Sequence, residues 1–157
     1  SDSVVAPLLW FALLGLPGAA LYRFANTADA MWGYPGMHGG RHWQWAGKWA
    51  AHADDVLNWL PARLTAGLLM LGARRTLWRA LPAQAALTPS PNGGWPMGAM
   101  ALRLGVGLGK PGVYRLNAQA PAPQTVHTWQ ALRRARFAAW LAVVLCAGGA
   151  VLSGPWG

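Results

Sequence analysis

Two adjacent aspartates, Asp54 and Asp55, are the side chains in this sequence best suited to chemistry. The chain carries only four acidic residues, all of them aspartate, against thirteen lysines and arginines. In a helix, Asn58 would lie one turn beyond both aspartates, and Arg63 follows within apolar sequence. Adjacent carboxylates near a cation can hold Mg²⁺ and its bound phosphates, because Mg²⁺ prefers hard oxygen ligands and needs few from the protein. The spacing therefore indicates a candidate metal site at Asp54 and Asp55.

The aspartate pair also has a simpler interpretation, as the start of a helix. Aspartates in the first turn interact favourably with the helix dipole and are common there. Against this, charged and amide groups within apolar sequence are costly unless they have partners or a task. Asn58 and Arg63 are such groups, and they favour a site.

A second candidate is the loop of residues 90–96, which contains two prolines and two glycines. Such a loop can turn its backbone N–H groups toward an anion, or it can be an ordinary turn before a helix. Lys110 follows a Gly-rich run, but the spacing differs from that of a phosphate loop, and Pro111 stands where Ser or Thr should follow. His38 and His42 are four residues apart, yet the glycines around them argue against a helix, and we expect no metal site there.

The composition points to a membrane protein. Hydrophobic residues make up 54% of the chain and charged residues 11%, compared with about 25% charged residues in a soluble domain. Eleven tryptophans add to this, because Trp favours the membrane–water interface. The formal charge of +9 is spread in small clusters beside apolar segments, which suits anionic lipid headgroups better than DNA or RNA. We therefore expect a lipid bilayer as partner and no nucleic acid.

The apolar segments predict an all-α, multi-pass integral membrane protein with kinked or re-entrant helices and Gly/Pro-rich loops. The whole chain, 1–157, would form one membrane domain. Pro7 and Pro17 interrupt the first segment, and Pro61 makes the second the better candidate for a re-entrant path. Residues 119–128 have the composition of a linker. The segments are 4–22, 56–72 and 137–152.

Several blocks together resemble the CobD/CbiB family of cobalamin biosynthesis, the membrane-bound adenosylcobinamide-phosphate synthases. The resemblance covers roughly residues 1–115, in order and with plausible spacing, and the chain looks like the C-terminal half of such a protein. The matching blocks are 1–8, 17–34, 45–46, 54–65, 90–100, 104–106 and 112–114.

This resemblance implies an ATP-dependent amide ligation in vitamin B12 biosynthesis. Adenosylcobyric acid would be joined to aminopropanol, or to its O-phosphate, to give adenosylcobinamide or its phosphate. The implied cofactors are ATP and Mg²⁺, and the implied location is the inner cell membrane of a bacterium. The implied partners are the corrinoid, the aminopropanol, the bilayer and other late membrane enzymes of the pathway.

The resemblance also gives roles to particular residues. The pair at 54–55 would contact the metal or the amine, together with Asp29 and Asn26, and we expect catalytic roles for Asp29, Asp54, Asp55 and Asn58. Substrate contacts are expected from Asp2, Asn26, Arg41, Arg63, Ser90, Asn92 and Trp95. Two alternatives stay open: a non-catalytic membrane scaffold or sensor, and a transporter built on broken helices.

Overall fold

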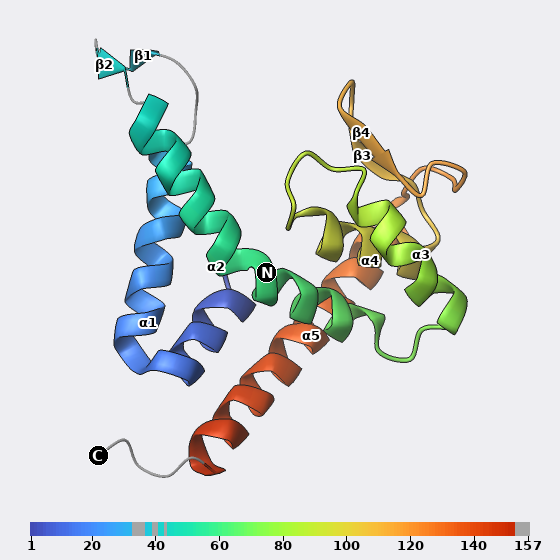
Figure 1. Ribbon diagram of the computed structural model, residues 1–157. Helices are drawn as coiled ribbons and strands as arrows, with labels where there is room; N and C mark the ends of the chain where they lie inside the picture. Colours follow the sequence, from blue (N-terminus) through green and yellow to red (C-terminus); the bar gives the residue numbers. More distant parts are fainter. Residues whose placement is uncertain (33–36, 39–40, 43, 153–157) are drawn as a thin grey trace.

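The computed structural model describes the backbone of residues 1–32, 37–38, 41–42 and 44–152, and the side chains of residues 1–32 and 47–148. Helices α1 and α2 lie side by side, and α5 runs diagonally beside the second group of elements, formed by α3, α4 and a hairpin (Figure 1). The helices are α1 (Val5–Trp32), α2 (Gln44–Met70), α3 (Arg75–Ala85), α4 (Gly94–Leu104) and α5 (Thr125–Leu152).

The described residues are mostly helical, as predicted, with two short antiparallel hairpins in addition to the five helices. Strand β1 (Met37–His38) pairs with β2 (Arg41–His42), and β3 (Leu108–Lys110) pairs with β4 (Tyr114–Leu116). Lys110 ends a strand rather than entering a helix, so the rejection of a phosphate loop is confirmed. The predicted linker at 119–128 is wrong in part, because α5 already begins at Thr125.

Helix α1 is bent sharply at Gly15. This residue has φ 65° and ψ −157°, a conformation that glycine adopts without steric cost. The two halves of α1 approach closely beyond the bend: a Cβ atom on Gly18 would lie 2.6 Å from the carbonyl oxygen of Trp10. The chain therefore turns back on itself between the halves (Figure 1). A kinked first segment was one of the predicted paths, and it is confirmed.

Helix α2, in contrast, continues through Pro61 as one helix, and the re-entrant path of its segment stays a prediction. Proline has no N–H group and leaves the carbonyl oxygen one turn earlier without its helical partner. That carbonyl belongs to Leu57, and the indole Nε1 of Trp10 donates a hydrogen bond to it at 3.0 Å. The first half of α1 is thereby docked on α2 at the position where α2 lacks a backbone donor.

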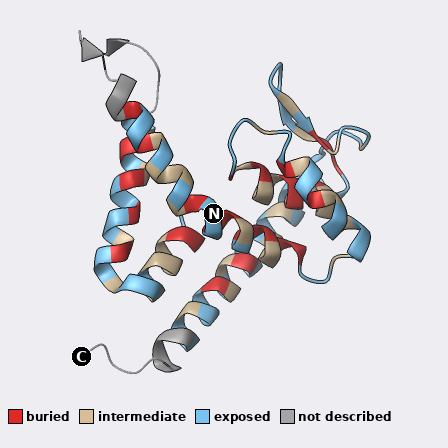
Figure 2. Ribbon diagram, in the orientation of Figure 1, coloured by how far each residue is buried: buried red, intermediate tan, exposed pale blue. Residues whose placement is uncertain are grey.

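The buried core lies where four helices meet, and it is built largely from small side chains. Figure 2 shows buried positions on α2 and α4, which are in extensive contact. Small residues allow helix backbones to approach closely, and large residues fill the space that remains. The core residues are Ala66, Leu69, Met70, Leu81, Ala99 and Ala138.

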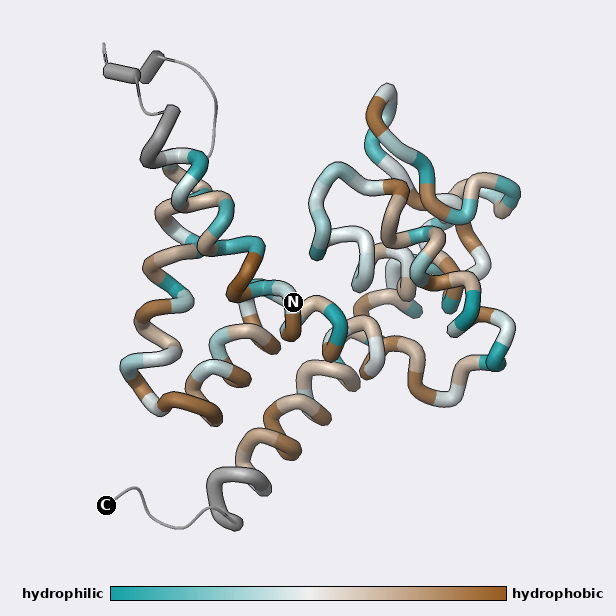
Figure 3. The backbone as a smooth tube through the Cα atoms, viewed as in Figure 1, coloured by the Kyte–Doolittle hydropathy of each residue, from teal (hydrophilic) through white to brown (hydrophobic). Residues whose placement is uncertain are grey.

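Large apolar side chains are also exposed, especially along α1 and α5, where hydropathy is high (Figure 3). Leu16 is 72% exposed, Phe24 67% and Trp140 68%, which is far from the usual covering of apolar surface in a soluble monomer. Among the described residues, one helix, α1, has the length and apolar composition needed to cross a membrane, when both halves on either side of the bend at Gly15 are counted together. The other two predicted segments fall within α2 and α5, so multi-pass character stays a prediction.

Candidate functional site

The predicted site residues come together where α1, α2 and the loop before α4 meet. The aspartate pair lies well inside α2, whose first turn contains no acidic residue. The helix-start interpretation of Asp54 and Asp55 is therefore wrong. Both carboxylates are partly buried, and each is held by an asparagine from a different part of the chain.

Asp54 is fixed by α1. The Nδ2 group of Asn26 donates a hydrogen bond to Oδ1 of Asp54 at 3.0 Å. The second carboxylate oxygen of Asp54 accepts no hydrogen bond from the described residues. Asn26 thus orients the carboxylate without neutralising it, and one oxygen remains available to a ligand.

Asp55 is fixed from the other side by Asn92, which is only 6% exposed. The Nδ2 group of Asn92 donates to the backbone carbonyl of Asp55 at 2.8 Å and, more weakly, to its carboxylate Oδ1 at 3.4 Å. The Oδ1 atom of Asn92 in turn accepts a hydrogen bond from Arg63 at 3.2 Å. One buried amide therefore links a carboxylate to a guanidinium.

Arg63 lies between two aromatic rings. Its guanidinium carbon is 4.2 Å from the ring centroid of Trp59 and 4.8 Å from that of Trp95, and its NH1 donates to the carbonyl of Trp59 at 2.7 Å. Arginine stacks well on indole faces, and these contacts restrict its many rotamers. The side chain presents a fixed positive charge that is linked to Asp55 through the amide of Asn92.

Ser90 shapes the loop that carries Asn92. Its Oγ accepts hydrogen bonds from the backbone N–H groups of Asn92 at 3.3 Å and Gly93 at 3.1 Å. This loop therefore directs two of its N–H groups to its own serine, and the segment is a turn leading into α4. The prediction that Ser90 contacts substrate stays a prediction.

Asn58 lies deepest in the site, at 2% exposure. The hydroxyl of Tyr22 lies 3.0 Å from Oδ1 of Asn58 and 3.1 Å from the backbone carbonyl of Asp2, so it can donate to either oxygen. Asp2 thus takes part through its backbone, while its carboxylate accepts the hydroxyl of Ser1. Asn58 joins α2 to α1 and to the N-terminal residues beneath the aspartates.

The site is strongly negative. Asp29 on α1 lies within electrostatic range of both Asp54 and Asp55, and none of the three carboxylates forms an ion pair within the described residues. Burial and the charge of Asp54 raise the pKa of Asp55, and nearby His52 opposes this shift. Uncompensated carboxylates of this kind attract cations.

The donors fit Mg²⁺ better than a metal that requires a full protein cage. In the described part of the chain, no group of three or more His, Cys, Asp or Glu side chains is arranged to hold a metal. Mg²⁺ is commonly held by one or two carboxylates and completes its shell with water and phosphate oxygens. Asp54 and Asp55 are two such carboxylates, and Mg²⁺ binding by them stays a prediction.

Sequence reasoning found most of this site and missed part of it. Arg41 belongs to the residues whose side chains are not described, so its role stays a prediction. Tyr22 and Trp59 were not singled out. Trp59 stands four residues before Arg63, a spacing that places two side chains on one helix face and that could have identified it.

Comparison with known proteins identifies the family. The family model described as CobD/Cbib protein matches residues 1–151, so the chain belongs to the CobD/Cbib family. No solved structure matches the chain.

Three relatives are similar to this chain over part of their own length. "Cobalamin biosynthesis protein CobD" of Chromobacterium violaceum is 44% identical over 98% of this chain and 51% of its own length, and that of Stutzerimonas stutzeri is 43% identical over 94% and 51%. A "Probable cobalamin biosynthesis protein CobD" of Methanothermobacter thermautotrophicus is 49% identical over 74% of this chain and 40% of its own length. The chain therefore spans about half the length of the curated relatives it matches.

Proposed function

We propose that this chain forms the carboxylate-bearing part of an ATP-dependent amide ligase of cobalamin biosynthesis, an adenosylcobinamide-phosphate synthase. The substrates would be adenosylcobyric acid and aminopropanol or its O-phosphate. Family membership and the names of the relatives support the pathway. The observation that carries the chemical proposal is the aspartate pair, held inside α2 by Asn26 and Asn92 and left without a counter-ion in the described residues.

The chemistry explains why such a pair would be needed. A free carboxylate is a poor acyl donor, so one of its oxygens must be converted into a phosphorylated leaving group at the expense of ATP before the amine attacks. Mg²⁺, when bound by Asp54 and Asp55, would offset the charge on the phosphates. Asn26 and Asn92 keep both carboxylates in position, which lowers the cost of organising the site.

The remaining residues have roles that follow from their charge. Arg63, clamped by Trp59 and Trp95, offers a positive charge to a phosphate or to a corrinoid carboxylate or amide. Asp29, which accepts no hydrogen bond among the described residues, can hold the ammonium form of the aminopropanol and take the proton that its nitrogen loses when the amide bond forms.

The location that fits this proposal is the inner membrane, with several spans in the complete protein. The support is helix α1, together with the exposed apolar side chains of α1 and α5. A membrane location would bring the enzyme close to other late membrane enzymes of the pathway, and no step requires nucleic acid.

The deciding experiment is an assay of the purified protein at its full natural length. It would be supplied with adenosylcobyric acid, ATP, Mg²⁺ and aminopropanol phosphate, and the corrinoid amide would be followed together with ADP and AMP. We expect one nucleotide cleaved per amide formed, and no product without Mg²⁺. Corrinoid binding without ATP consumption would overturn the proposal in favour of a scaffold or sensor, and corrinoid uptake into proteoliposomes in favour of a transporter.

A further inference from the structure

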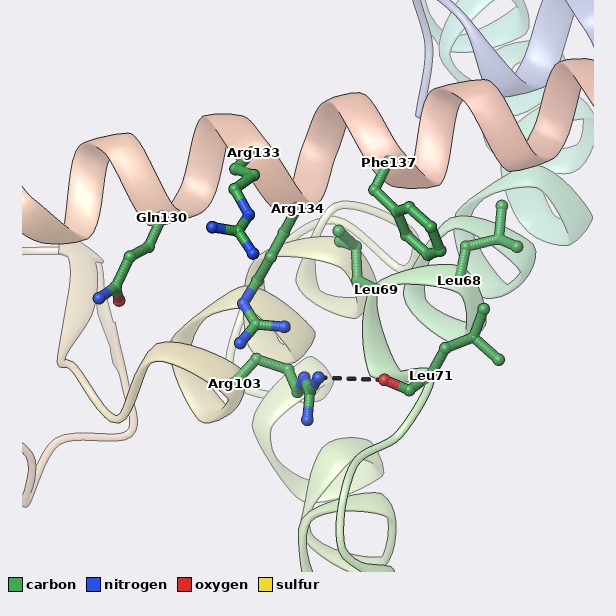
Figure 4. Close-up of a pocket in the computed structure, with 8 residues that line it drawn as sticks. All are labelled: Leu68, Leu69, Leu71, Arg103, Gln130, Arg133, Arg134 and Phe137. Carbon is green, nitrogen blue, oxygen red and sulfur yellow. Dashed lines mark hydrogen bonds between the residues drawn. The ribbon is translucent and has the colours of Figure 1, made fainter.

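A second charged region lies at the opposite end of α2, well apart from the aspartates. A cavity of about 540 Å³ opens between the end of α2, helix α4 and helix α5. Leu69, which lines it, follows Asp55 by roughly 20 Å of helix. Figure 4 shows its lining residues: Leu68, Leu69, Leu71, Arg103, Gln130, Arg133, Arg134 and Phe137.

The polar lining of this cavity is positively charged and rich in hydrogen-bond donors. Arg103 comes from α4, and Arg133 and Arg134 come from α5, together with the amide of Gln130. No acidic side chain lines the cavity among the described residues. Burial lowers the pKa of Arg134, and the charges of Arg103 and Arg133 lower it further.

Within the described residues, most guanidinium N–H groups of these arginines have no acceptor. Arg133 and Arg134 donate no hydrogen bond and form no ion pair within the described residues. Arg103 donates from NH2 to the carbonyl of Leu71 at 3.0 Å, but its buried Nε has no partner there. Native structures seldom leave a buried donor unpaired, and like charges gathered in a cavity call for an anion.

The other wall of the cavity is apolar. Leu68, Leu69 and Phe137 stand beyond the arginines (Figure 4), and Phe137 is 61% exposed. Phe137 is also the first residue of the apolar run 137–152. A row of arginines immediately before an apolar helical run is the arrangement that places guanidinium groups at the level of lipid headgroups.

We propose that this cavity is a phosphate-binding site, with Arg103, Arg133 and Arg134 as its ligands, and that the apolar wall favours the phosphate of an anionic phospholipid over a free phosphate ion. The guanidinium groups would donate to the phosphate oxygens, and the apolar wall would receive the upper part of an acyl chain. This site is independent of the aspartates and of the proposed ligase activity.

The test compares two double variants of the protein at its full natural length. Arg133→Gln with Arg134→Gln removes two charges from the cavity without breaking a hydrogen bond of the described residues. Arg75→Gln with Arg79→Gln removes two exposed charges from α3 and controls for general electrostatic attraction. Native mass spectrometry would measure how much phosphatidylglycerol each variant retains from nanodiscs of phosphatidylglycerol and phosphatidylcholine, in competition with inorganic phosphate or ATP.

We expect the cavity variant to retain phosphatidylglycerol at least about tenfold more weakly than the wild type, and the α3 variant to retain it normally. Phosphatidylglycerol should also raise the Tm of the wild type and leave that of the cavity variant unchanged, which separates binding from a folding defect. Competition by inorganic phosphate or ATP would assign the site to free phosphate as well. Equal retention and equal thermal shifts in wild type and cavity variant would overturn the proposal.

Discussion

The aspartate site and the arginine cavity each gather side chains of like charge, but they differ in how the surrounding residues support those side chains. At the aspartates, Asn26 and Asn92 reach in from other elements and fix the carboxylates through neutral amides. In the cavity, Arg133 and Arg134 receive no such support from the described residues. The first region is organised before a ligand arrives, whereas the second consists of donors that an anion would have to organise.

This difference suits the two regions to different kinds of ligand. A neutral amide orients a carboxylate and leaves its charge available, which suits a site that must place reacting groups accurately. Unsupported arginines suit a ligand whose position matters less than its charge and its apolar attachment. In both regions the chain keeps charge that its own described residues do not neutralise, so each region is open to a partner of opposite charge.

The largest effect is expected from removing a carboxylate of the aspartate site. Asp54→Ala or Asp55→Ala should lower amide formation by about a thousandfold or more, because each change removes a carboxylate that would bind Mg²⁺. The measurement is the ligase assay on membrane-inserted, full-length protein. Val56→Ala, an exposed change on the same helix, serves as the control. Product formation at the normal rate by both aspartate variants would remove the aspartates from the mechanism.

A smaller effect, on the free energy of unfolding, is expected from substitutions that disturb the loop bearing Asn92. A Cβ atom on Gly94 would collide with the backbone carbonyl of Ala85, whereas one on Gly93 would meet only ordinary contacts, the nearest at 3.5 Å. Gly94→Ala should therefore cost about 1–3 kcal/mol of unfolding free energy, and Gly93→Ala about 0.5 kcal/mol or less.

Chemical denaturation of both variants in detergent would measure these costs. Gly94→Ala should also weaken Mg²⁺ binding, since it displaces the loop that holds Asp55, while phosphatidylglycerol retention by the cavity should remain. Equal stability of the Gly93 and Gly94 variants would show that α3 and α4 can separate freely and that the loop is not anchored as described.

The smallest expected effect is the pH dependence of stability and of Mg²⁺ affinity that comes from Asp55. Because the pKa of Asp55 is raised, the folded protein holds this proton more tightly than the unfolded chain does. The group therefore stabilises the fold below the ordinary aspartate range, and this contribution is lost as the pH rises through the raised pKa. For Mg²⁺ the sign is opposite, since the metal needs the carboxylate, and affinity should fall on acidification at a higher pH than for an ordinary aspartate.

Titration calorimetry of Mg²⁺ over a pH series would measure the midpoint of this loss. His52 opposes the shift, so His52→Gln should move the midpoint to slightly higher pH. A midpoint at the ordinary aspartate value in both proteins would contradict the electrostatic description of the site.

The sequence could predict which polar residues of α2 lie in the candidate site better than the contacts that hold them in place. Helical spacing and apolar surroundings were enough to single out Asp54, Asp55, Asn58 and Arg63. The contacts from Asn26 and Asn92 depend on how α1 and the loop at 90–93 pack against α2, and local spacing carries no information on such packing. The resemblance named both asparagines, but it did not specify which aspartate each one holds.

The path of the helices was harder to predict, and the bend shows why. Pro61 favoured a re-entrant path for its segment, yet α2 continues through it as one helix. A proline interrupts a helix less when another group satisfies the carbonyl it leaves free, and the donor here is Trp10, far away in sequence. In the first segment, Pro7 and Pro17 were expected to interrupt the helix, but the bend is at Gly15. The region 73–129 contains many prolines, yet α4 forms because Pro96 falls in its first turn, where no N–H partner is needed.

The hydrogen bond between Trp10 and Leu57 makes two distant positions thermodynamically dependent on each other. If residue 61 carried an N–H group, that group would compete with the indole for the same carbonyl oxygen. Replacing Pro61 with alanine would therefore strengthen α2 locally and weaken the attachment of the first half of α1. Trp10 would then lose its energetic importance, so the effect of substituting it depends on which residue occupies position 61. The effect of a substitution at either of these two positions therefore depends on the residue at the other.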